Sequence, residues 1–189
     1  MRRGWVLLMV LTGAGLTAAP AGAQSAGQVG VAMGYPASID VVWHVFDRLA
    51  LRPELTLGTT SGETSSTGQT FASTVDGWNV GVGLGALVYT RRWDRLRTYV
   101  SPRVAWSRST ANSGTAPAGG ALSDSTSTVY AASLSFGGQY ALGRHFAVFG
   151  EVGYAYNHDD VVYTSGTART DAITRTTGPR TAVGVVLYF

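Results

Sequence analysis

Hydrophobic and polar positions alternate along most of the chain after residue 23. In the last segment, Val183, Val185, Leu187 and Phe189 share one face, and the residues between them share the other. A period of two residues is that of a β-strand whose two faces meet different surroundings. We therefore predict strands near 28–35, 38–46, 49–59, 75–90, 97–110, 126–142, 145–157 and 177–189.

The two faces of these strands divide the residue types in an unusual way. One face carries bulky apolar residues such as Val82, Leu84 and Val152, and the other carries glycine, alanine, serine and charged residues. A soluble β-sandwich would place its charges outside and its large residues inside. The reverse arrangement is typical of a barrel with lipid outside and a polar interior. We predict an all-β fold, an up-and-down antiparallel transmembrane β-barrel with a polar lumen.

Aromatic residues near the predicted strand ends agree with this fold, because membrane barrels carry aromatic girdles at both interfaces. One rim is expected to hold Trp106, Tyr130, Tyr154 and Tyr156, and the other Tyr140, Phe146 and Phe189.

The connections between the strands alternate in length. Short turns are expected at 47–48, 91–95 and 143–145, and long loops rich in Ser, Thr and Gly at about 60–74, 111–125 and 159–175. Short periplasmic turns and longer outer loops are the asymmetry of outer-membrane barrels. The stretch 28–46 makes seven strands if it is one strand and eight if it breaks at 36–38. We choose eight, because single-chain bacterial barrels have even strand numbers.

The composition of the chain indicates an N-terminal targeting segment and argues against a nucleic-acid partner. Residues 1–23 are predicted to be a cleaved signal peptide, with Arg2 and Arg3 before an apolar stretch and Ala21-Gly22-Ala23 at the cleavage site; an uncleaved anchor is the alternative. The barrel domain is then 24–189. Two of the 14 basic residues leave with the signal, so the remainder nearly balances the 11 acidic residues. We expect no nucleic-acid partner.

The whole pattern resembles the eight-stranded outer-membrane barrels of Gram-negative bacteria, the OmpA-like transmembrane domain and the OmpX-type proteins. The most specific element is Phe189 preceded by Val183, Val185 and Leu187. The resemblance implies that this C-terminal strand is the signal read by the outer-membrane assembly machinery. It also implies a place in the cell outer membrane, reached by Sec export through the periplasm, with outer-membrane lipid as the surroundings. We expect a monomer.

Charged residues fall on the inward faces of several predicted strands. These residues are Arg52, Glu54, Arg103 and Glu151, with Asp40 and His44 added in the eight-strand arrangement. An eight-stranded barrel is just wide enough for its side chains, so charges inside must pair or be hydrated. We expect an ion-pair network that plugs the lumen. An ion path gated by these pairs is the alternative.

Two further motifs are read structurally. His158-Asp159-Asp160 near the outer rim is expected to be a solvated loop entry, with a lipid-modifying enzyme as the sharper alternative; adjacent residues on extended chain converge poorly on a metal. Gly81, Gly83 and Gly85 alternate with apolar residues and precede no predicted helix, so they are small interior positions and no phosphate-binding loop. Without a cysteine, cysteine-dependent sites are excluded.

From the sequence we predict a barrel with a structural or surface-interaction role, no catalytic residues, no metal and no cofactor. The alternatives are a lipid-modifying outer-membrane enzyme and a narrow, porin-like ion-conducting pore.

Overall fold

Eight antiparallel strands, joined in chain order, form a barrel in the computed structural model, which describes residues 26–35, 38–65, 72–116 and 123–189. The strands are β1 (Val29–Tyr35), β2 (Ser38–Phe46), β3 (Leu49–Ser65), β4 (Ala72–Arg92), β5 (Leu96–Ala116), β6 (Ser123–Ala141), β7 (Phe146–Ser165) and β8 (Ala168–Tyr188). The predicted signal peptide lies outside the described residues. No helix in the described part of the chain is long and apolar enough to cross a membrane.

The first and last strands pair with each other and close the barrel. Their register runs from Gly30 opposite Tyr188 to Tyr35 opposite Val183. Beyond β8, the amide of Phe189 donates to the carbonyl of Val29 at 3.0 Å. The stretch 28–46 forms two strands, so the eight-strand prediction is confirmed.

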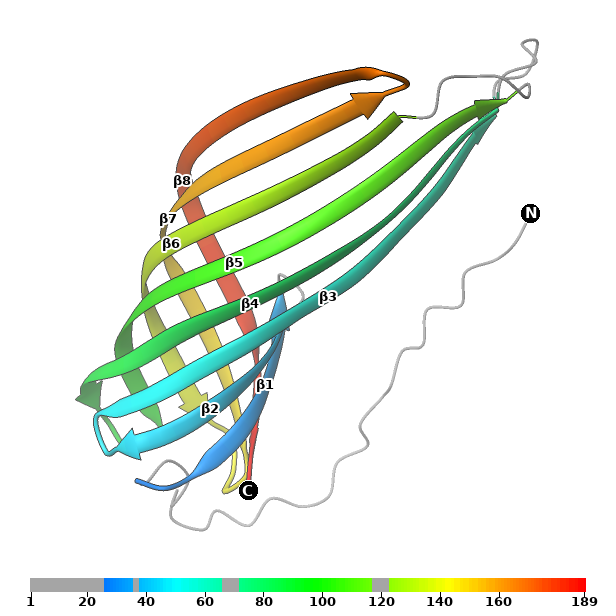
Figure 1. Cartoon of the computed structure of the whole chain (residues 1–189). Coiled ribbons are helices and arrows are strands. Elements are labelled where there is room, and N and C mark those ends of the chain that lie inside the picture. Colours follow the sequence, from blue (N-terminus) through cyan, green and yellow to red (C-terminus); the bar gives the residue numbers. More distant parts are fainter. Residues whose placement is uncertain (1–25, 36–37, 66–71, 117–122) are drawn as a thin grey trace.

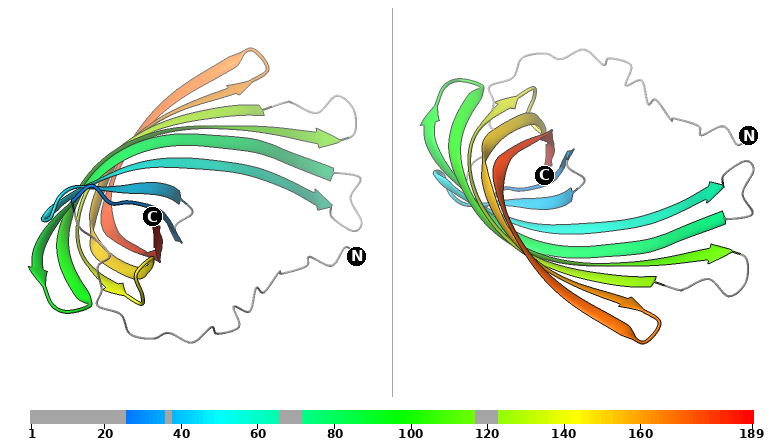
Figure 2. Two further views of the ribbon diagram at one scale, coloured as in Figure 1. Left: turned by 90° about the horizontal axis from the view of Figure 1, so that it is seen from below. Right: turned by 90° about the horizontal axis from the view of Figure 1, so that it is seen from above.

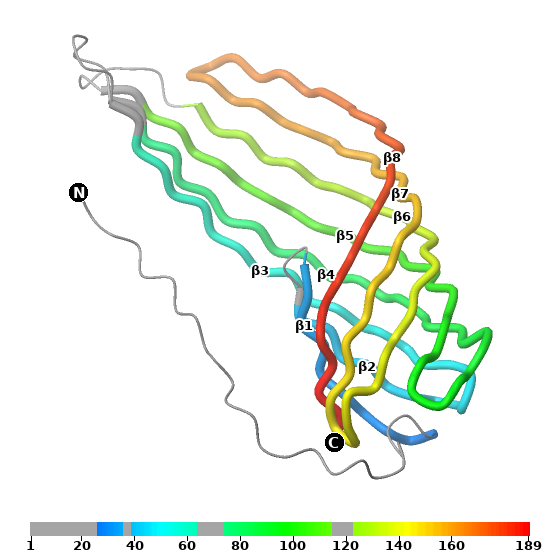
Figure 3. Tube along the Cα trace, turned by 180° about the vertical axis from the view of Figure 1, so that it is seen from behind, coloured from blue at the N-terminus to red at the C-terminus, as the bar shows by residue number. Residues whose placement is uncertain are grey.

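The barrel is closed at one end and flared at the other (Figures 1 and 2). The closed end holds the three short turns and the C-terminus, and we call it the short-turn end. β1 and β2 have only 7 and 9 residues, whereas β4, β5 and β8 each have 21. The β2–β3 pairing ends at Leu55, and the β1–β8 pairing ends at Val183. Beyond these points β3 to β8 continue as a curved six-stranded sheet, with β3 and β8 at its edges (Figure 3).

This flared sheet corrects the loop predictions. The predicted loops at about 60–74, 111–125 and 159–175 are mainly strand: 60–65, 72–74, 111–116, 123–125, 159–165 and 168–175 all belong to the sheet. Residues 66–71 and 117–122 lie outside the described residues. The ladder continues because these segments keep their backbone partners, as in Thr60 opposite Gly77. β7 and β8 are joined by two residues only, and Gly166 has a φ of 58°, the conformation that tight hairpin turns require.

The two faces of the wall differ as the period predicts. Outward residues such as Val82, Leu134 and Val152 are more than half exposed. Inward residues such as Ala50, Ala147 and Val186 are buried, and they form the apolar part of the interior. Large apolar side chains therefore cover the outside of the closed part, while the inside holds small residues, a few larger apolar ones such as Val42 and Leu87, and the polar groups described next.

Candidate functional site in the barrel interior

Glu151 on β7 is the centre of a buried charged layer across the barrel. Arg52 on β3 donates two hydrogen bonds to its carboxylate, from Nη1 to Oε1 at 2.5 Å and from Nη2 to Oε2 at 3.3 Å. Arg180 on β8 donates to Oε2 at 3.1 Å, and the Tyr99 hydroxyl on β5 donates to Oε1 at 3.0 Å. The Glu151 side chain has no exposed surface. One carboxylate thus ties together strands from opposite sides of the barrel.

A second ion pair lies in the same layer. The Arg103 guanidinium donates two hydrogen bonds to the carboxylate of Glu54, one of them from Nε to Oε2 at 2.7 Å. Asp40 on β2 adds a carboxylate 3.9 Å from Arg52 Nε. Five of the six charged or titratable residues predicted for the interior therefore lie together in this layer, namely Asp40, Arg52, Glu54, Arg103 and Glu151.

His44, the sixth of these residues, belongs to a different layer. It lies four residues further along β2 than Asp40, nearer the short-turn end, and is fully buried. Its ring stacks on Tyr89 at a centroid distance of 5.5 Å, and its Nε2 lies 3.3 Å from the Tyr188 hydroxyl. Gln139 joins these tyrosines, because its amide donates to Tyr188 at 2.6 Å and its Oε1 accepts from Tyr89 at 3.1 Å. We call His44, Tyr89, Gln139 and Tyr188 the aromatic layer.

Little free volume separates the two layers. The cavity between them measures about 10 Å³ and is lined by apolar residues such as Val42 and Leu87, with Tyr99 on one side and Gln139 on the other. A cavity of that size is at the lower limit for one water molecule. Beyond the charged layer a larger cavity of about 150 Å³ is lined by Arg103, Arg180 and Tyr35.

Several interior residues are missing from the sequence-based set. Tyr99 and Arg180 complete the shell around Glu151, and Tyr89, Gln139 and Tyr188 build the aromatic layer. The alternation of residues along β8 could have predicted that Arg180 points inward, because Arg180 shares the inward face with Ala182 and Gly184. The alternation of residues along one strand shows which of them point inward, but it does not show which residue of another strand each one contacts across the lumen.

Glycines make room for these layers. A Cβ added at Gly137 would lie 2.7 Å from the Tyr99 ring and 2.9 Å from Glu151 Cγ. Gly83 lies directly beside the Glu54 side chain. The alternating glycines of β4 are thus interior positions on a strand, as predicted from the sequence.

His158, Asp159 and Asp160 do not converge on one site. His158 Nε2 lies 3.2 Å from Asp160, and Arg175 Nε lies 3.4 Å from His158 Nδ1. Asp159 accepts a hydrogen bond of 2.5 Å from Ser127. Both ring nitrogens thus face charged groups, whereas a nucleophilic triad needs a hydroxyl beside one of them. Within the described ranges, no three His, Asp or Glu side chains are grouped closely enough to hold a metal.

The residues predicted to form the assembly signal lie on the outside of the closed part. Val183, Val185 and Leu187 point outward from β8, and Phe189 follows at the short-turn end with 73% of its surface exposed.

Comparisons with known proteins bear on the fold. No protein-family model matches the chain, and no curated protein matches it. Among solved structures, the chain is similar to a major outer membrane protein from Thermus thermophilus, with 12% identity, a TM-score of 0.58, and coverage of 86% of this chain and 98% of that one. It is also similar to CarO from Acinetobacter baumannii, with 17% identity and a TM-score of 0.44 over 87% of this chain and 98% of that one. The likeness to the Thermus structure supports the antiparallel β-barrel fold of this chain.

Proposed function

We propose that the chain is an integral outer-membrane barrel with a plugged lumen, which serves a structural or surface-interaction role and is neither an open pore nor an enzyme. The observation that carries the proposal is the stacking of the charged layer on the aromatic layer, with a cavity of only about 10 Å³ between them. The fold shared with the Thermus outer membrane protein supports the location.

The outward apolar belt supports placement in a bilayer. On β7 the outward residues from Phe146 to Tyr156 are apolar or aromatic, apart from Gly150. A strand of 11 residues tilted by about 45° spans roughly 25 Å, the height of the apolar band in such barrels. The upper edge of this belt is marked by Trp106 opposite Tyr130 on neighbouring strands. Trp78 on β4 is also exposed on the outward side.

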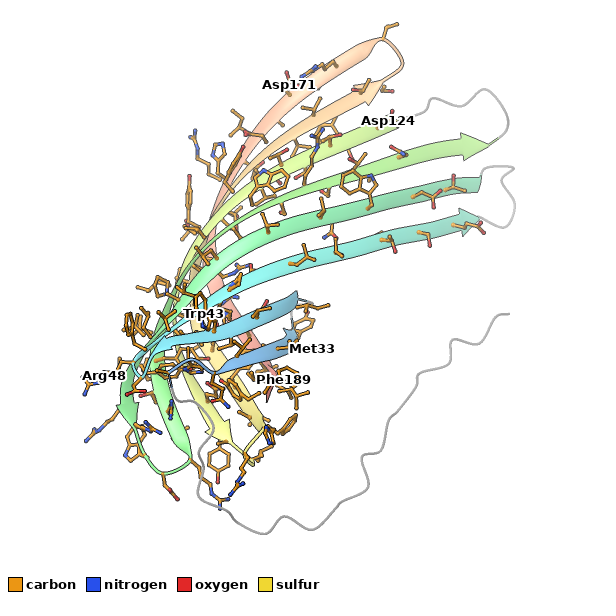
Figure 4. The ribbon with its side chains drawn as sticks, turned by 60° about the horizontal axis from the view of Figure 1, so that its bottom comes forward. Met33, Trp43, Arg48, Asp124, Asp171 and Phe189 are labelled. Atoms are coloured by element: carbon orange, nitrogen blue, oxygen red, sulfur yellow. The ribbon has the colours of Figure 1, made fainter. Side chains whose placement is uncertain are left out.

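The flared sheet beyond the belt is the region that we assign to surface interactions. Its outward positions change from apolar to polar, as in Arg108, Thr128 and Asp160. Figure 4 shows Asp124 and Asp171 on this sheet, far from Phe189 at the short-turn end. With the short-turn end in the periplasm, this polar sheet would extend beyond the outer leaflet, where it is available to partners.

Conductance in planar bilayers tests the plugged lumen. The folded protein is expected to give no reproducible single-channel steps, because two packed layers block the water path. Glu151→Gln removes a charge but keeps the side-chain shape, and it is expected to stay silent as well if the barrel folds. A regular conductance in the unaltered protein, changed by Glu151→Gln, would support the gated-pore alternative instead.

The C-terminal assembly signal is tested in living cells. Phe189→Ala is expected to lower the amount of barrel in the outer membrane several-fold, because the proposed recognition strand loses its terminal aromatic ring. The measurement is quantitative immunoblotting of membrane fractions, with heat-dependent gel migration to report folding. Phe46→Ala is the matched control, since Phe46 is also exposed at the short-turn end but outside the last strand. Equal levels of both variants and the unaltered protein would refute recognition through Phe189.

A further inference from the structure

Four arginines line a cavity at the short-turn end of the barrel. The cavity measures about 290 Å³, roughly ten times the volume of a water molecule in the liquid. Arg48 comes from the β2–β3 turn, Arg91 and Arg92 end β4, and Arg97 is the second residue of β5. The other lining residues are Asp47, Tyr89 and Thr90. Figure 4 shows Arg48 at this turn, remote from the flared sheet.

The charges of this cavity are poorly balanced. Asp47 is the only carboxylate among the described residues that line it, and one of its oxygens accepts a hydrogen bond from the Ala26 amide at 3.3 Å. Arg92 and Arg97 are direct cross-strand neighbours. Like charges in that position destabilise a sheet. Four guanidiniums thus share one carboxylate among the described lining residues, so the cavity has an excess of positive charge.

Aromatic rings hold two of these guanidiniums in place. Arg97, only 4% exposed, lies over the ring of Tyr89 with 5.7 Å between the guanidinium carbon and the ring centroid. Arg91 lies 5.3 Å above the ring of Trp93. Cation–π contacts orient a guanidinium without removing its net charge. These two contacts thus fix the positions of both guanidiniums at the cavity wall.

The interior of the same barrel offers a contrast. Arg52, Arg103 and Arg180 each contact a glutamate in the charged layer. Arg48, Arg91 and Arg92 form no ion pair with any described residue. A bound anion at the short-turn end would supply a counter-charge for these three arginines.

We propose that this cavity binds a phosphate-bearing anion, with Arg92 and Arg97 as the central pair and Arg48 and Arg91 beside them. Guanidinium groups match phosphate oxygens with paired hydrogen bonds. The ligand chemistry is shared by the headgroup of an anionic phospholipid and by free phosphate. Exposed Phe46 and Trp93 at the same end place the cavity at the level of a membrane interface, which favours the lipid.

Binding is tested on the folded full-length barrel in detergent. Phosphatidylglycerol is titrated and followed by native mass spectrometry, and inorganic pyrophosphate is titrated and followed by calorimetry. The double variant Arg92→Gln/Arg97→Gln is expected to weaken phosphatidylglycerol binding at least ten-fold. The control is Arg95→Gln/Arg144→Gln, which removes two exposed arginines from the same end without touching the cavity lining. It is expected to bind within two-fold of the unaltered protein.

The two probes distinguish the sources of phosphate. Binding of the lipid without pyrophosphate assigns the cavity to a headgroup, and competition between the two assigns it to phosphate in general. Equal losses in both double variants, or no binding of either probe to the unaltered protein, overturn the proposal. If Arg92→Gln/Arg97→Gln does not fold, Arg48→Gln/Arg91→Gln takes its place with the same criteria, because both of those side chains are exposed.

Discussion

Replacing Glu151 with alanine is expected to be the most damaging single change in the interior. The substitution leaves the buried Arg52 and the partly buried Arg180 without the carboxylate of Glu151, and it also removes the acceptor of the Tyr99 hydroxyl. Removing one partner of a buried ion pair costs about 3–5 kcal/mol, because the remaining charge stays desolvated. Urea unfolding of the barrel in lipid vesicles, followed by tryptophan fluorescence, measures the change in the free energy of unfolding.

An exposed ion pair provides the control for this prediction. Arg169 donates to Asp171 at 3.1 Å near the tip of the flared sheet, and both side chains are about two-thirds exposed. Asp171→Ala is expected to change the free energy of unfolding by less than about 1 kcal/mol, since surface pairs contribute little. If Glu151→Ala costs no more than Asp171→Ala, the charged layer does not stabilise the barrel as described.

Placing an arginine on the lipid-facing side is expected to have an effect of similar size. Val152 points outward near the middle of the apolar belt on β7, with 58% of its surface exposed. An arginine at the bilayer midplane of a membrane barrel costs about 2–4 kcal/mol. Val152→Arg should therefore lower the free energy of unfolding by that amount in the same vesicle assay. In a water-soluble barrel the same substitution at an exposed position would change little.

The same substitution on the flared sheet should be tolerated. Thr164 is an exposed outward position on the same strand, beyond the belt. Thr164→Arg is expected to stay within about 0.5 kcal/mol of the unaltered protein, as surface substitutions usually do. Equal costs for Val152→Arg and Thr164→Arg would mean that the belt does not mark the depth of the bilayer.

The closed part of the fold could be predicted from the sequence because the outward face of its wall is apolar and the inward face carries small and polar residues. This difference makes the residue period visible, as between Val152 and Glu151 on β7. It also reveals the short turns, where the alternation stops and charged residues such as Arg48 appear. The division of 28–46 into two strands followed from the even strand number and not from the local residues.

The flared sheet was missed for a physical reason. Segments such as 60–65 and 111–116 carry Ser, Thr, Gly and polar residues on both faces, so they show no apolar period. The backbone pairing that continues there depends on the neighbouring strands. These segments have a composition that is typical of loops, but they form strands because the neighbouring long strands provide backbone hydrogen-bond partners.

For the interior residues, the sequence predicted which face of the strand they lie on but not which residues they contact. Inward parity placed Arg52 and Glu151 inside, yet the contact between them joins residues 99 positions apart. His44 shows the same limit, because its face was predicted but not its depth in the barrel. Depth depends on how far each strand is shifted relative to the next, and that shift is set by the closure of β1 on β8.

In the proposed membrane barrel, the apolar side of the wall faces lipid and the polar side faces inward. Because the chain has no cysteine, single cysteines can be introduced and spin-labelled without removing others. Labels at Leu134, in the belt, and at Thr164, on the flared sheet, are compared in a bilayer by their collisions with oxygen and with a water-soluble nickel chelate. The label at Leu134 should respond to oxygen and not to the chelate, and the label at Thr164 should respond to the chelate. Free access of the chelate to Leu134 would contradict a membrane barrel.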